Sequence, residues 1–147
     1  MYLGLGSNLG NKEENLRKAI SMINEQIGTV VRQSAFFYSE PWGYESDNQF
    51  VNAVILVETS LSPYDVLTAN QRIEHLLGKT QAHATERHSD LSLQSSDLRP
   101  PIYHDRPIDI DILLYDDLHM DEPELKIPHP LMEERDFVMI PLNEIRK

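Results

Sequence analysis

Two aspartates, Asp109 and Asp111, are the residues whose type and spacing most directly suggest chemistry. They lie in an apolar run at 108–115, IDIDILLY, which predicts a β-strand. Because strand side chains alternate between faces, both carboxylates are expected on one face and the isoleucines on the opposite, core-facing side. Neighbouring carboxylates repel unless a cation lies between them, and carboxylates suit Mg²⁺, which completes its shell with phosphates. The pair predicts a metal site, with an exposed polar strand face as the alternative.

Other candidate residues occur in pairs. Phe50 and Asn52 share a face of the strand predicted at 50–59, where a ring beside an amide could stack on a flat heterocycle and hydrogen-bond its edge. Ordinary core packing is the alternative. His129 and Arg135, after a Pro-His-Pro sequence, could meet phosphate oxygens, although such a pair is also common on surfaces.

A glycine-rich segment at 4–10, GLGSNLG, lies between a predicted strand and a predicted helix. Its glycines do not match the G-x-G-x-x-G pattern, and no G-K-[ST] follows, so we exclude a dinucleotide fingerprint and a Walker loop. We expect a tight turn at Gly6, with Asn8 hydrogen-bonding the backbone.

The elements that must position these residues follow the order β-α-β-β-α-β. Asn11 predicts a helix start and Gly28 its end, while Ser62 and Pro63 predict a second helix that Gly78 stops. The predicted strands lie at 2–6, 29–38, 50–59 and 108–115, a long polar loop lies at about 79–107, and 131–145 has a mixed helical pattern. This order predicts an α+β, ferredoxin-like sandwich: a small, mostly antiparallel sheet with helices on one face and a C-terminal appendage.

The composition excludes several classes of binding partner and site. The 147 residues predict a single domain over 1–147, and a net charge of −11, with acids concentrated at 104–136, argues against a nucleic-acid partner. Without cysteine there is no disulfide, thiolate zinc site or cysteine nucleophile. No apolar run approaches the roughly 20 residues that span a bilayer. We therefore expect a cytoplasmic protein without a membrane partner.

Seven short motifs together carry a specific resemblance. In chain order they are GSNLG at 6–10, EPWG at 40–43, FVNA at 50–53, QRIE at 71–74, RPIDIDI at 106–112, PHP at 128–130 and ERDFV at 134–138. This order resembles the 6-hydroxymethyl-7,8-dihydropterin pyrophosphokinase family over nearly the whole chain. The resemblance implies transfer of the pyrophosphoryl group of ATP to the pterin hydroxymethyl group, with release of AMP, in folate biosynthesis.

The resemblance also implies roles for individual residues. Asp109 and Asp111 would be catalytic and hold two Mg²⁺ ions, with Arg106 as a third catalytic residue. The residues implied to bind the pterin are Ser39, Trp42, Phe50, Asn52 and Phe137, with the two phenyl rings stacking on it and the amide reading its edge. The residues implied to bind ATP are Gln71, Glu74, Lys79, Arg106, His129 and Arg135.

The chain departs from the family pattern after the second predicted helix. The family carries two arginines there, and the matching positions hold Lys79 and Gln81, while Tyr103 stands where an aromatic residue, commonly tryptophan, is found. Two alternative functions stay open. Another Mg²⁺-dependent transferase would release ADP or pyrophosphate instead of AMP, and a catalytically silent binding module would bind ATP or pterin without turnover. An RNA-binding sandwich is disfavoured by the acidity.

Overall fold

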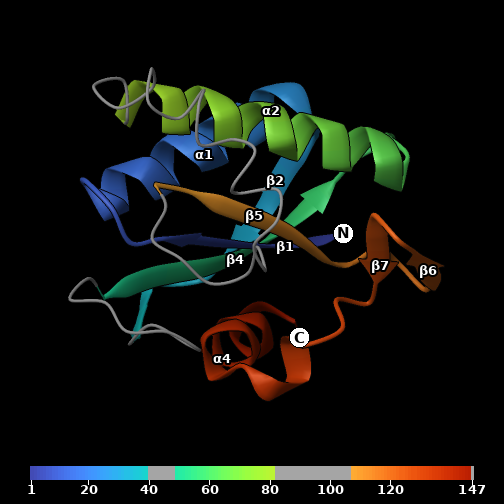
Figure 1. Ribbon diagram of the computed structural model, residues 1–147. Helices are drawn as coiled ribbons and strands as arrows, with labels where there is room; N and C mark the ends of the chain where they lie inside the picture. The colour runs from blue at the N-terminus through green and yellow to red at the C-terminus, as the bar shows by residue number, and fades with distance from the viewer. Residues whose placement is uncertain (40–48, 82–106, 147) are drawn as a thin grey trace.

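An antiparallel sheet lies at the centre of the protein, between two layers of helix (Figure 1). The computed structural model describes residues 1–39, 49–81 and 107–146. Four strands follow the order β2-β4-β1-β5, and β3 also pairs with β4. The strand bounds are β1 Tyr2–Ser7, β2 Thr29–Gln33, β3 Phe37–Ser39, β4 Phe50–Glu58 and β5 Asp109–Leu114. The predicted α+β class is confirmed.

The first two helices cover one face of this sheet (Figure 1). Helix α1, Lys12–Gln26, begins as predicted, because the Asn11 side chain accepts a hydrogen bond from the Glu14 N–H at 3.2 Å. Helix α2, Pro63–Gln81, has the predicted Ser62 cap, whose hydroxyl oxygen accepts from the Asp65 N–H. Both helices bury apolar side chains against the sheet: Leu16, Ala19, Ile23, Val66, Ile73 and Leu77.

The predicted end of the second helix is wrong. Helix α2 continues through Gly78 to Gln81, so the loop predicted from residue 79 does not begin there. A glycine inside a helix costs only about 1 kcal/mol relative to alanine, which the rest of a long helix readily offsets. Gly28, in contrast, does follow the end of α1, and its N–H donates to the Ile23 carbonyl at 3.2 Å.

The C-terminal helix α4, Asp136–Ile145, packs on the opposite face of the sheet (Figure 1). Val138 and Leu142 of this helix form a second buried cluster with Val54 and Leu113 of the sheet. The two predicted helices do share one face, and the C-terminal segment, predicted only as an appendage, covers the other. Because β4 is apolar on both faces, its second face also has to be covered, and the supposed appendage does so.

Three further local features differ from the prediction or refine it. The strand predicted at 29–38 is split into β2 and β3, because Ser34 lies buried between them and its hydroxyl oxygen accepts from the Val54 N–H at 3.0 Å. A short hairpin of β6, Met120–Glu122, and β7, Leu125–Ile127, was not predicted. Residues 131–145 form a 3-10 turn η2, Met132–Glu134, followed by α4.

The glycine-rich segment does not turn at Gly6. Gly6 lies inside β1, and Gly10 is the residue with a positive φ of 70°. The buried Asn15 of α1 holds the loop, donating from Nδ2 to the Leu9 carbonyl at 2.9 Å and to the Ser7 hydroxyl at 3.3 Å. In the described residues, no helix has the length and apolar character needed to cross a membrane.

Candidate active site

The sheet face beneath α4 carries a row of three residues on three neighbouring strands. Gly6 of β1 pairs with Asn52 of β4 on one side and with Asp109 of β5 on the other. In the next row Gly4 lies between Val54 and Asp111. Side chains directly opposite each other in a sheet share a face. Because glycine has no side chain, the strip of β1 between the amide and the two carboxylates exposes only main chain on this face.

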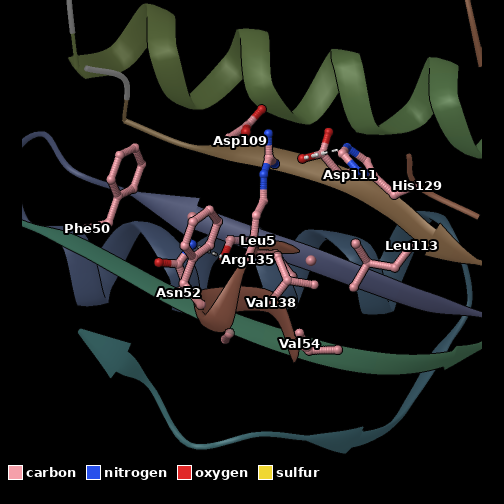
Figure 2. Close-up of a pocket in the computed structure, with 14 residues that line it drawn as sticks. Leu5, Phe50, Asn52, Val54, Asp109, Asp111, Leu113, His129, Arg135 and Val138 are labelled. Atoms are coloured by element: carbon pink, nitrogen blue, oxygen red, sulfur yellow. Dashed lines mark hydrogen bonds and ion pairs between the residues drawn. The ribbon is translucent and has the colours of Figure 1, made fainter. Parts of the chain in front are cut away.

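A cavity opens over these two glycines, and we call it the glycine-floored cavity (Figure 2). Strands β1, β4 and β5 form its floor, and Phe137 and Val138 of α4 line it from the other layer. His129, after the β6–β7 hairpin, and Arg135, at the start of α4, complete the polar lining. Sheet and C-terminal helix together therefore build a site that neither would form alone.

The two aspartates lie as predicted. Asp109 and Asp111 are half-buried at the cavity, whereas Ile110 and Ile112, which alternate with them, are buried on the face toward α1 and α2. The His129 ring approaches this pair, with its Nε2 at 4.0 Å from Oδ2 of Asp111 (Figure 2). Strand alternation thus places the two carboxylates at one edge of the cavity, and the segment after β7 adds an imidazole beside them.

Arg135 brings positive charge to an otherwise acidic site. The side chain is 8% exposed and extends from the start of α4 toward the carboxylates (Figure 2), with its guanidinium carbon 5.6 Å from the centre of the Phe137 ring. Burial lowers the pKa of His129, the charge of Arg135 lowers it further, and Asp109 acts in the opposite direction. The His129 imidazole is therefore kept toward its neutral form, and the Arg135 guanidinium supplies the positive charge at the cavity.

The Asn52 amide is oriented by its neighbours. The Ser39 hydroxyl donates to Asn52 Oδ1 at 3.3 Å, and Asn52 Nδ2 donates to the Leu5 carbonyl at 3.4 Å. The asparagine is 7% exposed, and Phe50 lies beside it on the same strand face. The predicted neighbourhood of Ser39, Phe50, Asn52 and Phe137 is thus brought together in the structure.

Two of the residues expected to bind ATP lie elsewhere. Glu74 of α2 reaches β5 from the opposite layer, and its Oε2 accepts a hydrogen bond from the Ile110 N–H at 2.7 Å. Gln71 is exposed one turn earlier in α2, and neither residue lines the glycine-floored cavity. Trp42, Arg106 and Tyr103 lie outside the described residues, as does the side chain of Lys79.

A second hollow lies on the other side of β5, next to the β6–β7 hairpin. Leu67 of α2, Ile112 of β5 and Lys126 of β7 line it, and it shares Asp111 and His129 with the glycine-floored cavity. Sequence reasoning missed Lys126, Leu67 and the two floor glycines as site residues. The even spacing of Gly4 and Gly6 could have placed both on one strand face, but nothing local marked Leu67 or Lys126.

Comparison with known proteins decides the family. The model of the 7,8-dihydro-6-hydroxymethylpterin-pyrophosphokinase family matches residues 2–147. The chain belongs to this family. As a pyrophosphokinase of folate synthesis, it transfers the pyrophosphoryl group of ATP to 6-hydroxymethyl-7,8-dihydropterin.

Individual relatives agree with the family match. A 2-amino-4-hydroxy-6-hydroxymethyldihydropteridine pyrophosphokinase of Porphyromonas gingivalis is 41% identical over 146 residues, which cover 99% of this chain and 89% of the relative. The pyrophosphokinase of the same name from Bacillus subtilis is 35% identical over 145 residues, covering 98% and 76%. That of Aquifex aeolicus is 34% identical over 145 residues, covering 99% and 79%.

Proposed function

We propose that the glycine-floored cavity is where this pyrophosphokinase binds the pterin and presents its hydroxymethyl group to ATP. One observation carries the proposal: Asn52, Gly6 and Asp109 lie side by side across three strands, so an amide and a carboxylate flank a floor without side chains. A flat ring can occupy the cavity above that floor, with one edge at the amide and its two faces free for the phenyl rings of the lining. The substituent at its opposite end then points toward the carboxylates.

The amide supplies recognition of the ring edge. Its Oδ1 and Nδ2 already contact Ser39 and Leu5, and a primary amide has a further acceptor site and a further donor hydrogen. A ring that presents a donor beside an acceptor matches both. Phe50 and Phe137 add apolar surface, and we propose that they stack on the two faces of the pterin.

Asp109 and Asp111 fit a hard divalent cation such as Mg²⁺, because both offer carboxylate oxygens on one strand face. In the described part of the chain no group of three or more potential ligands (His, Cys, Asp or Glu) could hold a metal. We propose that the two aspartates bind magnesium, two ions in all. Since the described residues add no third ligand group, substrate phosphates and water would be the remaining ligands. Bound Mg²⁺ would neutralise charge on the triphosphate.

The second hollow is our candidate for the nucleotide site. This hollow and the glycine-floored cavity share Asp111 and His129 in their linings, so a ligand that spans both would pass these two side chains. We propose that the base and ribose of ATP lie near Leu67 and Lys126 and that the triphosphate crosses β5 toward the pterin. The Arg135 guanidinium provides positive charge at the pterin end of this path. The Lys126 ammonium at the other end is paired with the Asp121 carboxylate at 2.7 Å.

Catalysis in this arrangement is mainly positioning. Phosphoryl-type transfers require an in-line approach and neutralised charge more than covalent chemistry from the protein. Arg135 is suited to hold phosphate oxygens, because its fork of donors is fixed and always charged. The neutral imidazole of His129 can donate or accept a hydrogen bond without adding a second charge. Arg106, Lys79, Gln71 and Trp42 stay predicted contributors from the family resemblance.

The test is the nucleotide product. Purified protein is incubated with MgATP and 6-hydroxymethyl-7,8-dihydropterin, and the nucleotides are separated by anion-exchange chromatography. We expect AMP to appear in a one-to-one ratio with pyrophosphorylated pterin, and no AMP when the pterin is omitted. ADP or free pyrophosphate as product would indicate another transferase. Binding of both ligands without any product would indicate a silent binding module.

We also propose a ferredoxin-like arrangement in one domain over residues 1–147, supported by the strand order β2-β4-β1-β5 and by the helices α1 and α2 on one face. A cytoplasmic location is our proposal from the composition, which contains no cysteine.

A further inference from the structure

The missing side chain of Gly6 has a specific neighbour. A Cβ atom at position 6 would lie 2.8 Å from Nδ2 of Asn52 and 3.6 Å from Cδ1 of Phe50. The first separation is shorter than van der Waals contact allows, so alanine at this position requires one of the two groups to move. Among the described residues, a Cβ at position 6 would therefore clash only with the amide that we propose reads the pterin.

The group that would move is the amide and not the backbone. The nearest atom is the end of the Asn52 side chain, which can rotate away without disturbing the pairing of β1 with β4. Gly28 is the contrasting case, because a Cβ there would overlap the main-chain oxygen of Glu58. A substitution at Gly28 would therefore disturb the main chain and destabilise the fold, whereas one at Gly6 would change the orientation of a single side chain.

Displacing the amide would break the arrangement that orients it. Asn52 is 7% exposed, and its two polar atoms are placed by the Ser39 hydroxyl and the Leu5 carbonyl. A rotation that relieves contact with a Cβ at position 6 moves Nδ2 away from Leu5, which precedes Gly6 on β1. The donor and acceptor would then no longer lie beside the floor.

We propose that Gly6 is a specificity-determining position: its bare backbone lets the Asn52 amide lie beside the cavity floor, where it reads the donor–acceptor edge of a flat heterocycle. This inference rests on the proposed function. Gly6 acts through Asn52, so it is a positioning residue and takes no part in phosphate or metal binding. Its loss should weaken the pterin selectively and leave MgATP binding unchanged.

The experiment compares alanine at three glycines. Gly6→Ala is the test. Gly4→Ala is matched to it, because it changes the same strand face of the same cavity but meets the flexible Leu113 side chain at 3.3 Å. Gly78→Ala is the distant control, since no atom of the described residues lies within 4 Å of a Cβ there. Binding of the pterin, in the presence of a non-hydrolysable ATP analogue, and of MgATP is measured by calorimetry.

We expect Gly6→Ala to raise the pterin Kd about tenfold, the loss expected for one misplaced hydrogen-bonding group in a buried site, while the MgATP Kd changes less than about twofold. Gly4→Ala should have a smaller effect on the pterin, and Gly78→Ala none. An unchanged pterin Kd in Gly6→Ala, or equal losses for both ligands, would overturn the proposal.

A double-mutant cycle separates positioning from a general packing defect. In an Asn52→Ala background there is no amide to displace, so adding Gly6→Ala should change the pterin Kd less than about twofold. Additive losses would overturn the proposal. If Gly6→Ala alone fails to fold, recovery of the fold in the double variant supports the conflict with Asn52, and failure to recover it contradicts the conflict.

Measurements on the wild-type protein distinguish a failure of the inference about Gly6 from a failure of the proposed function. Wild type that binds the pterin and releases AMP, together with a Gly6→Ala variant that binds equally well, would sink only the inference about Gly6. Wild type that neither binds the pterin nor releases AMP would overturn the proposed function and this inference with it.

Discussion

Glu74 on α2 accepts a hydrogen bond from the main-chain N–H of Ile110 on β5, with 2.7 Å between Oε2 and the nitrogen. Ile110 is the residue between Asp109 and Asp111, so a carboxylate from one helical layer fixes the strand that presents two carboxylates to the other side. Glu74 thus supports the aspartate pair from the opposite face of the sheet.

Glu74→Ala should weaken this support. A hydrogen bond to a charged group contributes about 1.5–3 kcal/mol, so we expect a loss of that order in the free energy of unfolding, measured with urea. We also expect half-maximal AMP release to require more Mg²⁺. Glu74→Gln keeps an acceptor oxygen and should lie between wild type and Glu74→Ala. Unchanged Mg²⁺ dependence in Glu74→Ala would show that this hydrogen bond does not position the aspartates.

Asp109→Ala and Asp111→Ala should each lower the rate of AMP release at least about 10²-fold, because charge stabilisation of this kind is the largest catalytic term in many sites. Thermal melting should stay near that of wild type, since both side chains are only half-buried. Asp117→Ala, at an exposed acidic position, serves as the matched control. Near-normal turnover in both variants would refute the metal assignment.

His129 should make stability depend on pH. Its pKa in the folded protein is lowered from the ordinary 6.5 by burial and by the charge of Arg135, so the unfolded chain binds the proton more readily. Stability is therefore fully present above about pH 6.5 and decreases as the pH falls below it.

Urea unfolding at a series of pH values, with a metal chelator present, checks this expectation. The slope of the unfolding free energy between pH 7 and pH 5 should be smaller in His129→Gln than in wild type. Equal slopes in the two proteins would show that the imidazole gains its proton as easily in the folded state.

The far end of α4 is tied to β2 and to the segment that follows it. Glu144 accepts from the Ala35 N–H at 3.1 Å, and Arg32 donates to the Ile145 carbonyl at 2.9 Å. Because α4 also carries Phe137, we expect Glu144→Ala to lower the unfolding free energy by about 1 kcal/mol and to weaken the pterin more than ATP. Glu133→Ala, exposed in η2, is the control. A pterin Kd equal to that of wild type would show that the hydrogen bond of Glu144 does not affect pterin binding.

Asn70 of α2 is 1% exposed, and both polar atoms of its amide are buried without a hydrogen-bond partner in the part of the chain that the structure describes. An unsatisfied buried polar group costs about 1–3 kcal/mol, so we expect Asn70→Leu to raise the free energy of unfolding. Asn70→Ala, which leaves a void, should not. If Asn70→Leu is instead less stable than wild type, the amide is satisfied by a buried water that the leucine expels.

The sequence by itself determined the features that depend on local geometry. Strand alternation put Asp109 and Asp111 on one face, and the caps at Asn11 and Ser62 marked where two helices begin. The order of short motifs also identified the family, and the family match confirms it. These features follow from periods of two or 3.6 residues and from side chains that reach only a few positions along the chain.

The tertiary structure decided which distant segments meet. Asn52 and Asp109 follow Gly6 by about a third and about two-thirds of the chain. Only the pairing of β1 with both β4 and β5 places the glycine between the other two. The face covered by α4 depended on a second apolar surface of the sheet, which no local pattern near residue 136 records. The reason is physical: register and layer are set by burial and hydrogen bonding summed over the whole sheet, whereas a sequence window reports only its own periodicity.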